Sequence, residues 1–377
     1  MPDILAAMKA ITLIGAGRVG QLVAEHLVHA GDYRLTVLDR SAQALAQLPA
    51  HPRLRTQTVD LADGALLAER LRHQFAVLNA APFALAGTVA GAARVAGVHY
   101  LDLTEDVAAT RQARALAEGA PRAVLPQCGL APGFIAILGH DLAGRFERLH
   151  TLQLRVGALP EYPANALGYN LTWSPEGLIN EYCEPCEAIV DGRRALVPAL
   201  GDVESLTIDG EAFEAFNTSG GLGTLCETLA GRVQRLDYRS IRYPGHAAQM
   251  RLLLDGLRLR ERREWLRELL EFALPATLQD RVLVFATATG WREGRFEQQS
   301  RAVHVRHAEV YGRPRSAIQI ATAAGLCAAL DLLAQGRLPQ QGFVRQEDIA
   351  LADFLNNRFG RVYADGTAQP LPIPDAA

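Results

Sequence analysis

The sequence predicts an α/β protein built on a doubly wound parallel sheet, and three observations carry that prediction. Short apolar strands alternate with helical patterns through the first part of the 377 residues. A glycine motif, Gly15-Ala16-Gly17-Arg18-Val19-Gly20, follows the first strand and opens the first helix. An acid, Asp39, ends the second strand. Strands and helices that alternate with short loops predict a parallel sheet with helices on both faces.

The elements follow in order along the chain. Apolar residues 10–14 predict a strand, an apolar stripe over 19–27 predicts a helix that ends at Gly31, and 35–38 predicts the second strand. The pattern then repeats, with strands expected at 56–60, 75–79, 98–102 and 123–125, and with helices through 66–67, after Pro82 and over 108–116. We therefore expect a first domain over residues 1–132.

The pattern of predicted elements changes after Pro132. Strand-like runs at 149–156, 206–208 and 282–287 alternate with longer polar loops, and the charged amphipathic stretch 258–272 predicts a surface helix. These patterns predict a second domain over 133–312. C-terminal helices at 316–333 and 347–359 are expected within 313–364, and a flexible tail over 365–377.

Composition excludes several classes of function. A net charge of -3 provides no basic field for nucleic acid or an anionic membrane. No uninterrupted apolar stretch of roughly 18 residues occurs, and the N-terminus leads into a strand without a signal-peptide layout. We expect a cytoplasmic protein with no nucleic-acid or membrane partner.

The reactive side chains narrow the chemistry further. Five cysteines are too few and odd in number for a disulfide framework, so free thiols are expected. Cys183 and Cys186 form one CxxC without a second pair or a nearby histidine, so no metal site is predicted. Cys128 also has no histidine nearby and is interpreted as an inert buried thiol. Lys9, the only lysine, precedes the first strand, which argues against a lysine Schiff base or general base.

The glycine motif predicts a Rossmann-type fold that binds a dinucleotide. Gly15 makes the tight turn, Gly17 lets the backbone approach a pyrophosphate, and Gly20 allows close helix packing. The helix N-terminus, at Arg18 and Val19, favours the anion.

Asp39 predicts that the dinucleotide is NAD rather than NADP. Its carboxylate can accept hydrogen bonds from both ribose hydroxyls and would repel a 2′-phosphate, although the Arg40 guanidinium can pair with such a phosphate. The other candidate cofactor contacts follow predicted strands, where open α/β sheets bind ligands; they are Asp60, Asn79, Ala80, Ala81, Gly129 and Leu130. The segment 79–83 can instead be simply a tight strand-to-helix loop.

Three loops have a structural interpretation as helix starts, and the first two also have a functional one. Thr104 and Glu105 follow the fifth strand and can face nicotinamide and substrate, or Thr104 can cap the next helix with acids in its first turn. Pro132 suits the first position of another helix whose N–H groups are aimed at the cofactor. Ser174-Pro175-Glu176 predicts an ordinary helix start.

Several stretches together resemble the saccharopine dehydrogenase family, specifically the branch that contains lysine 6-dehydrogenase. The resemblance spans nearly the whole chain and rests, beyond the glycine motif, on VHYLDLTE (98–105), GLAPGFIAI (129–137), LGYNLTWSPEG (167–177), EAFNTSGG (214–221) and LDYRSIRYPGH (236–246). It implies a Rossmann domain closed by the C-terminal helices, and an inserted α/β domain that supplies substrate contacts and the interface of a homodimer. The reaction implied is hydride transfer from an amine-bearing carbon to the nicotinamide, followed by hydrolysis of the imine.

The resemblance also implies roles for individual residues. The family's arginine that binds a substrate carboxylate matches Arg242, which agrees with the fork geometry of a guanidinium. Residues matching Thr104, Trp173, Glu105, Gly129 and Leu130 line the cleft of the family, and Tyr243 beside Arg242 is a further substrate candidate. Glu105, Asp102 and His246 are the candidates for the general base.

Three functions remain open at this stage. Asp39 favours the NAD-dependent lysine branch over the saccharopine-forming reductases, which use NADP. Glu176, Glu181, Glu184 and Glu187 are candidate partners for the terminal amine of lysine, or acids of a helix start and a solvated face. The alternatives to lysine 6-dehydrogenase are a saccharopine or other amine dehydrogenase, and a non-catalytic NAD-binding protein.

Overall fold

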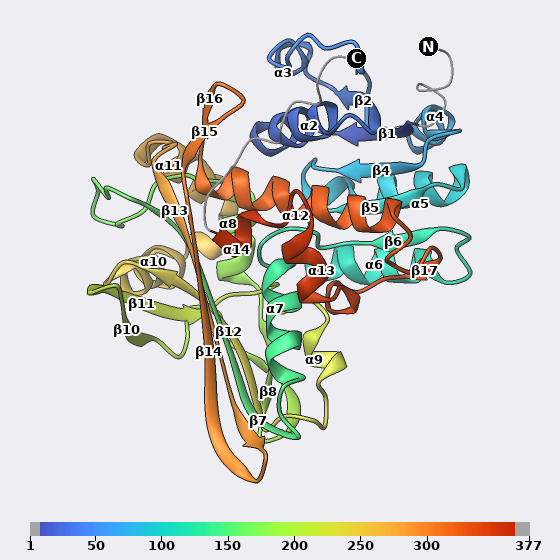
Figure 1. Cartoon of the computed structure of the whole chain (residues 1–377). Coiled ribbons are helices and arrows are strands. Elements are labelled where there is room, and N and C mark those ends of the chain that lie inside the picture. Colours follow the sequence, from blue (N-terminus) through green and yellow to red (C-terminus); the bar gives the residue numbers. More distant parts are fainter. Residues whose placement is uncertain (1–7, 366–377) are drawn as a thin grey trace. The chain divides into compact units, whose positions relative to one another are not determined.

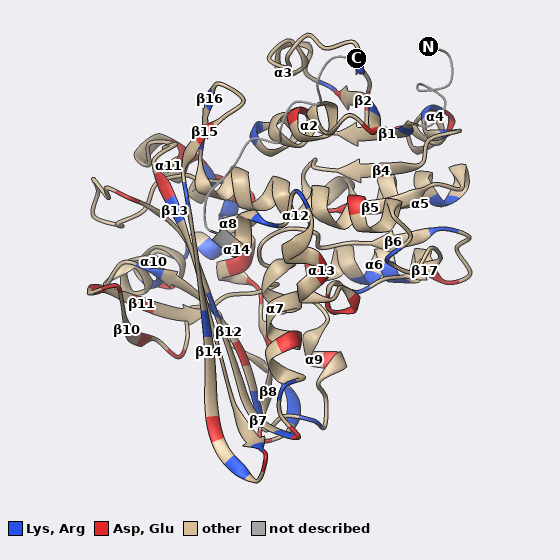
Figure 2. Cartoon of the chain, viewed as in Figure 1, with Lys and Arg blue, Asp and Glu red and all other residues tan. Residues whose placement is uncertain are grey.

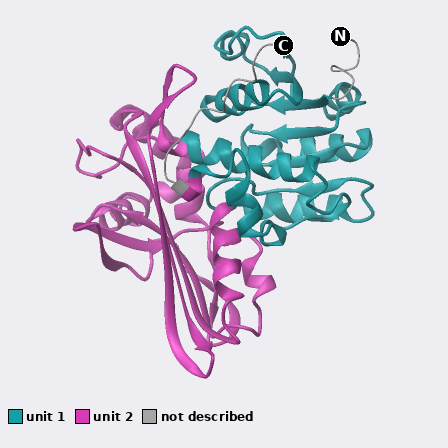
Figure 3. Cartoon of the chain, in the orientation of Figure 1, with its two compact units in different colours: residues 1–133, 319–362, 369–377 teal, residues 134–318, 363–368 magenta. Residues whose placement is uncertain are grey.

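The computed structural model describes residues 8–365 (Figure 1). The chain forms two compact units, shown in Figure 3. Within the described residues, unit 1 comprises the chain up to Gly133 together with Gln319–Val362, and unit 2 comprises Phe134–Ile318 and 363–365. Most of the expected tail, residues 366–377, lies outside the described residues. Acidic and basic residues are interspersed in both units (Figure 2).

Unit 1 is built on a seven-stranded sheet in the order β17-β6-β5-β4-β1-β2-β3, with parallel pairing throughout. The strands are β1 (Lys9–Ile14), β2 (Tyr33–Asp39), β3 (Leu54–Thr58), β4 (Ala76–Asn79), β5 (His99–Asp102), β6 (Ala123–Leu125) and β17 (Gly342–Phe343). Because β1 pairs with both β2 and β4, the strand order reverses beside β1, where such sheets bind ligands. The predicted doubly wound sheet is confirmed.

The helices of unit 1 follow the apolar periodicity of the sequence. Helix α2 (Arg18–Ala30) buries Leu22, Val23 and Leu27, and it ends at Gly31 with φ 91°. The left-handed φ at this position suits glycine, which has no Cβ to clash. The other helices of unit 1 are α3 (Ala42–Leu45), α4 (Gly64–Leu71), η1 (Phe83–Leu85), α5 (Ala86–Ala96), α6 (Val107–Ala117), η4 (Gln346–Asp348) and α13 (Leu351–Asn356). Two helices have residues in both units: α12 (Ala317–Ala334), which lies mostly in unit 1, and α14 (Val362–Asp365), which lies mostly in unit 2.

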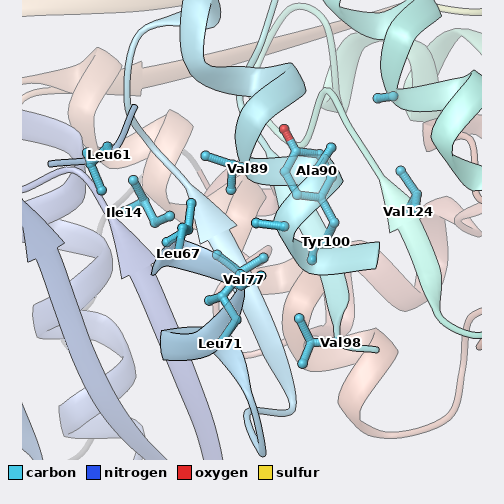
Figure 4. Packing of buried hydrophobic residues seen from close by; sticks show 14 of the residues in the cluster. Ile14, Leu61, Leu67, Leu71, Val77, Val89, Ala90, Val98, Tyr100 and Val124 are labelled. Carbon is cyan, nitrogen blue, oxygen red and sulfur yellow. The ribbon is translucent and has the colours of Figure 1, made fainter. Parts of the chain in front are cut away.

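Side chains from the sheet and from α4 and α5 pack into one core, in which Val77, Val89, Val98, Tyr100 and Val124 are buried (Figure 4). Full burial of a single aliphatic side chain contributes roughly 1.5–3 kcal/mol to folding. This packing fixes the carboxyl ends of the strands, and with them the loops that carry the candidate cofactor residues.

Helix α12 is apolar and, by length and composition alone, long enough to cross a membrane. However, 83% of it is buried inside the protein, and it carries Gln319 and Asp331. Its Gly325 approaches the loop after β6 so closely that an added Cβ would lie 2.7 Å from the Cys128 carbonyl oxygen. Helix α12 is therefore a core helix packed on the loop at 128–129.

Unit 2 is built on an eight-stranded mixed sheet whose main path is β10-β11-β12-β7-β13-β14, with β8 and β9 attached at β12. Its strands are β7 (Arg148–Pro160), β8 (Cys186–Val190), β9 (Arg193–Val197), β10 (Glu204–Ile208), β11 (Glu211–Asn217), β12 (Arg235–Arg242), β13 (Asp280–Arg292) and β14 (Arg295–Arg306), and a separate pair is formed by β15 (Ala308–Val310) and β16 (Arg313–Arg315). Its helices are α7 (Phe134–Ala143), α8 (Pro175–Cys183), α9 (Leu225–Thr228), α10 (His246–Arg251), η2 (Leu252–Gly256), η3 (Leu259–Glu261) and α11 (Arg263–Ala273).

Several expected elements of unit 2 have different bounds in the structure. The strands expected at 149–156 and 282–287 extend over β7 and β13, which pair along almost their full lengths. The surface helix expected at 258–272 begins only at Arg263, after a separate 3₁₀ turn. Strand β12, which lies centrally between β11 and β7, was not expected as a strand from its polar sequence.

The two faces of the unit 2 sheet carry different cores. Phe213 of β11 and Ile241 of β12 belong to a small cluster on one face. Phe216, also on β11, lies on the opposite face of the sheet, in a larger cluster with residues of α8, α10 and α11. Because side chains alternate along a strand, Arg242 points to this helix-covered face.

Candidate functional site

The glycine loop of unit 1 has the geometry that a bound pyrophosphate requires. Gly15 has φ 98°, and a Cβ there would lie 2.8 Å from the Ala80 carbonyl oxygen. A Cβ on Gly20 would lie 2.0 Å from the Gly15 carbonyl oxygen, whereas a Cβ on Gly17 would meet nothing within 4 Å. Gly15 and Gly20 are thus required by packing within the protein, while Gly17 leaves open space over the loop.

The N-terminus of α2 offers its N–H groups on the same loop. The N-cap Gly17 provides no side-chain hydrogen bond, and the first turn contains no acid. The first intrahelical bond joins the Gln21 N–H to the Gly17 carbonyl oxygen. The N–H groups of the first turn and the positive end of the helix dipole are therefore available to an anion. Arg18 is exposed beside them. These residues fit the diphosphate of a dinucleotide.

Asp39 is fixed at the edge of this loop by two backbone groups. Its Oδ2 accepts a hydrogen bond from Ala16 N at 2.7 Å, and its Oδ1 accepts one from Ser41 N at 2.8 Å. Each carboxylate oxygen retains a further lone pair for a ribose hydroxyl. Arg40 is exposed next to it. Asp39 therefore serves the loop structurally as well as offering acceptors, a role that the sequence did not indicate.

The remaining cofactor candidates differ in their placement. Asn79 ends β4, is buried, and accepts a hydrogen bond from Ala81 N through its Oδ1 at 3.1 Å. Ala80 N donates to the Ile14 carbonyl oxygen at 2.8 Å, which holds this turn beside the glycine loop. Asp60 is exposed, and its carboxylate accepts from Ala62 N within its own turn.

Asp102 ends β5 and is fully enclosed by donors. Its carboxylate accepts from the Tyr100 hydroxyl at 2.7 Å, Thr104 N at 3.1 Å and Gln127 N at 2.7 Å, while its carbonyl oxygen accepts from Cys128 N. Burial raises the pKa of this carboxyl to about 6, against the opposing effect of these hydrogen bonds. The arrangement makes Asp102 a buried brace between two loops, with a hydrogen-bond donor on each of its carboxylate oxygens.

Glu105 has the properties expected of a general base. Among residues 8–365 its carboxylate receives a hydrogen bond from its own backbone N–H and none from another side chain. Burial raises its pKa to about 7, and the neighbouring charges of Asp106 and Asp102 add to the shift. A carboxyl group with a pKa near the operating pH can take up and release a proton efficiently.

The helix-capping alternative for Thr104 is wrong. Helix α6 begins at Val107, and its N-cap is Asp106, whose carboxylate accepts from Ala109 N at 2.7 Å. The Thr104 hydroxyl instead accepts from Asp106 N at 3.2 Å, two residues before the N-cap. Thr104 therefore shapes the loop that presents Glu105.

The loop after β6 is held by Asp102 and α12. A bridge joins Gly129 to Gly133, and the Ala131–Pro132 peptide is cis. Helix α7 begins at Phe134, so the expectation that Pro132 occupies the first helical position is wrong. Cys128 is buried, its thiol receives a hydrogen bond from Gln346, and burial raises its pKa above the usual value, which keeps it protonated.

Unit 2 contributes a buried cation, Arg242, at the end of β12. Its side chain is 3% exposed, and its guanidinium lies 5.1 Å from the ring centroid of Tyr169 and 5.9 Å from that of Tyr182. Its Nε donates to the Tyr182 hydroxyl at 2.9 Å, and its Nη1 donates to the Ile241 carbonyl oxygen at 2.8 Å. Burial acts to lower its pKa, but Tyr182, Tyr169 and Glu181 raise it above the usual value. Among residues 8–365 the hydrogen-bond acceptors of this guanidinium are neutral oxygens of Tyr182 and Ile241, so it can also bind an external anion.

His246 and Tyr182 form the wall of this cation site. The Tyr182 hydroxyl and His246 Nε2 are 3.0 Å apart, and His246 Nδ1 is 2.9 Å from the Leu167 carbonyl oxygen. Burial, followed by the charge of Arg242, lowers the pKa of His246 to about 3. Both ring nitrogens are engaged and the ring is neutral at physiological pH, which leaves no free site for a substrate proton.

The other substrate candidates fall on opposite faces of the sheet. Trp173 is half-buried on the Arg242 side, and its Nε1 donates to the Tyr169 hydroxyl at 3.0 Å. Tyr243 packs in the cluster of the other face, and its hydroxyl donates to the Pro160 carbonyl oxygen and receives a hydrogen bond from Arg281. The structure therefore separates Tyr243 from Arg242, because consecutive strand residues point to opposite faces.

The acidic residues around α8 differ in their burial and in their partners. Ser174 caps α8 and Pro175 begins it, which confirms the predicted helix start. Glu184 pairs with Arg263, and Glu187 pairs with Arg194, both at the surface. Glu181 is buried. Within residues 8–365 no group of three metal-binding side chains occurs.

Comparison with known proteins gives two family matches that together span most of the chain. The model of the saccharopine dehydrogenase NADP binding domain matches residues 11–125, and that of the saccharopine dehydrogenase C-terminal domain matches residues 129–362.

Among the proteins that are similar to the chain are one of Bos taurus and one of Saccharomyces cerevisiae. Mitochondrial alpha-aminoadipic semialdehyde synthase of Bos taurus is 23% identical over 209 residues, which is 54% of this chain and 22% of that protein. The chain thus spans about a fifth of this relative. The structure of saccharopine dehydrogenase (L-Glu forming) from Saccharomyces cerevisiae aligns with a TM-score of 0.76 over 92% of this chain and 96% of the other, at 18% identity. This likeness shows a shared fold.

Proposed function

Because the chain belongs to the saccharopine dehydrogenase family of oxidoreductases that act on amino acids, we propose that it oxidises a C–N bond of an amino acid with NAD. The substrate proposed is L-lysine, oxidised at its 6-amino group. The observation that supports an amino-acid substrate is the buried Arg242, which forms no ion pair within residues 8–365 although the charge of Glu181 raises its pKa. A guanidinium in such surroundings suits an α-carboxylate.

The proposal gives each unit a separate task. In unit 1, the N–H groups of α2 and the Asp39 carboxylate would hold the dinucleotide, which supplies the hydride acceptor. Glu105 would take the proton that leaves the substrate nitrogen, so that the C–N bond becomes an imine as the hydride leaves carbon. Water then adds to the imine carbon and ammonia leaves, which yields the aldehyde. In unit 2, the Arg242 guanidinium suits the α-carboxylate of an amino acid.

Saccharopine is the second candidate substrate. The observation in its favour is the fold shared with the yeast saccharopine dehydrogenase. The choice of cofactor distinguishes the two candidate functions. Asp39 favours NAD, whereas the exposed Arg40 can pair with the 2′-phosphate of NADP. We further propose that the protein acts as a homodimer in the cytoplasm.

The test is a panel of amino acids assayed for NADH or NADPH formation. L-lysine with NAD should be the most efficient pair. Arg242→Met should raise KM for lysine by about 30-fold or more with a smaller change in kcat, because the contact exists in both ground and transition states. Turnover of saccharopine without turnover of lysine would transfer the function to the second candidate. Cofactor binding without turnover of any amino acid would favour a non-catalytic NAD-binding protein.

A further inference from the structure

The hydrogen bonds around Arg242 form a chain with one consistent direction. The Leu167 carbonyl oxygen can only accept, so His246 Nδ1 carries the proton and Nε2 is left as an acceptor. The Tyr182 hydroxyl must then donate to His246 Nε2, and its oxygen accepts from Arg242 Nε. Each donor in this chain meets one acceptor, so the hydrogen bonds fix both the tautomer of the histidine and the rotation of the tyrosine hydroxyl.

The same chain determines which edge of Arg242 is free. A guanidinium has five N–H donors. Nε is used by Tyr182 and one Nη1 hydrogen by the Ile241 carbonyl oxygen. No other partner occurs in the described residues, so the second Nη1 hydrogen and both Nη2 hydrogens remain for a ligand. The rings of Tyr169 and Tyr182 restrict the plane of the guanidinium.

A third residue holds the histidine in place from the backbone. Glu214 on β11 lies opposite Arg242 on β12 in the sheet register. Its Oε2 accepts from Gly245 N at 2.9 Å and its Oε1 accepts from Ala247 N at 2.6 Å, so both residues that flank His246 are tied to one carboxylate. The ring of His246 also stacks on Phe216 with an interplanar angle of 6°. His246 is therefore constrained by its backbone, its ring face and both ring nitrogens.

We propose that Tyr182 and His246 are positioning residues of the substrate-carboxylate site, which hold the Arg242 guanidinium so that its Nη edge is presented to the ligand. This inference rests on the proposed function in that the ligand is an amino-acid carboxylate. It assigns His246 to substrate binding through Tyr182 and Arg242, and not to proton transfer. Loss of the Tyr182 hydroxyl would leave a buried N–H of Arg242 and the acceptor of His246 without partners, and the guanidinium would reorient to recover a partner.

The experiment uses hexanoate, which has the carbon skeleton of lysine without its amines, as a probe that needs no turnover. Its affinity for the full-length protein saturated with NAD is measured by calorimetry, together with kcat and KM for lysine. We expect Tyr182→Phe to weaken hexanoate binding about tenfold and to raise KM by a similar factor, with kcat within about twofold. Tyr33→Phe is the matched control, because it removes a buried tyrosine hydroxyl bonded to Asp331 in unit 1. It should change thermal stability but neither constant.

Two further measurements separate positioning from a general structural effect. His246→Gln keeps a side-chain oxygen that can accept from Tyr182 and should bind hexanoate within about threefold of wild type, whereas His246→Leu should resemble Tyr182→Phe. Nitrogen-15 NMR of labelled histidine should show His246 as the neutral Nδ1–H tautomer. Hexanoate affinity unchanged in Tyr182→Phe, or no hexanoate binding by the wild type, would overturn the inference. Hexanoate binding that depends on Tyr182 in a protein that does not oxidise lysine would instead reject the proposed function and retain the carboxylate site.

Discussion

Replacing Glu105 by glutamine tests the proposed proton acceptor through stability and activity together. The structure raises the pKa of Glu105 from 4.5 to about 7, chiefly by burial. The folded protein therefore binds this proton more tightly than the unfolded chain does. Between about pH 4.5 and pH 7 the folded state retains more protons, so the contribution of Glu105 to stability is fully present below pH 4.5 and is lost as the pH rises towards 7.

The size of this effect follows from the shift. A difference from 4.5 to about 7 corresponds to up to roughly 3 kcal/mol of destabilisation when the group is ionised. Glutamine has nearly the same shape and no charge, so Glu105→Gln should be more stable than wild type at pH 8 by up to that amount and equal to it near pH 4. At the same time the variant should lose about 10²- to 10⁴-fold in kcat, because it cannot accept a proton.

The assay combines thermal unfolding at pH 4.5 and pH 8 with the pH dependence of kcat/KM for the active amino acid. For the wild type, kcat/KM should rise with pH to a plateau above about 7, as the carboxylate form accumulates. Glu69→Gln is the control, since Glu69 is an exposed acid on α4, and both properties should remain as in wild type. A Glu105→Gln protein that keeps wild-type kcat, or that shows no gain in stability at pH 8, would refute the assignment.

Two further predictions concern the glycine loop and its acid. Asp39→Ser should shift the preference from NAD towards NADP by about tenfold or more. It should also weaken the binding of both cofactors, because the Ala16 N–H loses its acceptor. Equal weakening of NAD and NADP in kinetic assays would argue against the ribose contact. Gly17→Ala should leave thermal stability unchanged and reduce NAD affinity, since the added Cβ enters open space, whereas Gly20→Ala should lower the melting temperature because its Cβ meets the Gly15 carbonyl oxygen at 2.0 Å. Titration of NAD against both variants, with melting curves, distinguishes the two effects.

The fold of unit 1 was predictable because local signals agree with each other there. The stripe buried by α2, the stop at Gly31 and the acid at the end of β2 all lie where the sequence placed them. Parallel strands buried on both faces have apolar sequences that are recognised one at a time. The loop details were less predictable, because Thr104 and Asp106 both have side chains that can cap a helix, and their order along the loop alone does not decide which one does.

Unit 2 was harder to predict because its strands carry polar residues that are satisfied only by tertiary partners. Strand β12 contains Asp237 and Arg239, which are buried in a network with Arg155 and Glu204 from β7 and β10. A sequence pattern cannot identify such partners before the strands are paired, so β12 was missed although it lies in the centre of the sheet. The resemblance to a family marked Arg242 but gave no indication of what surrounds it.

The positions of Tyr243 and Tyr182 show how the sheet register decides the chemistry of the site. Tyr243 was a substrate candidate because it follows Arg242 in sequence, yet strand alternation turns it to the opposite face. Tyr182, 60 residues from Arg242 in sequence, comes from α8 and binds its Nε. Two side chains that are adjacent in the sequence of a strand therefore lie on opposite faces of the sheet. The residues that orient a buried arginine come instead from the helix that covers its face. A search for the partners of such an arginine should start from the helices over its face of the sheet, and here it leads to Tyr182 and, through it, to His246.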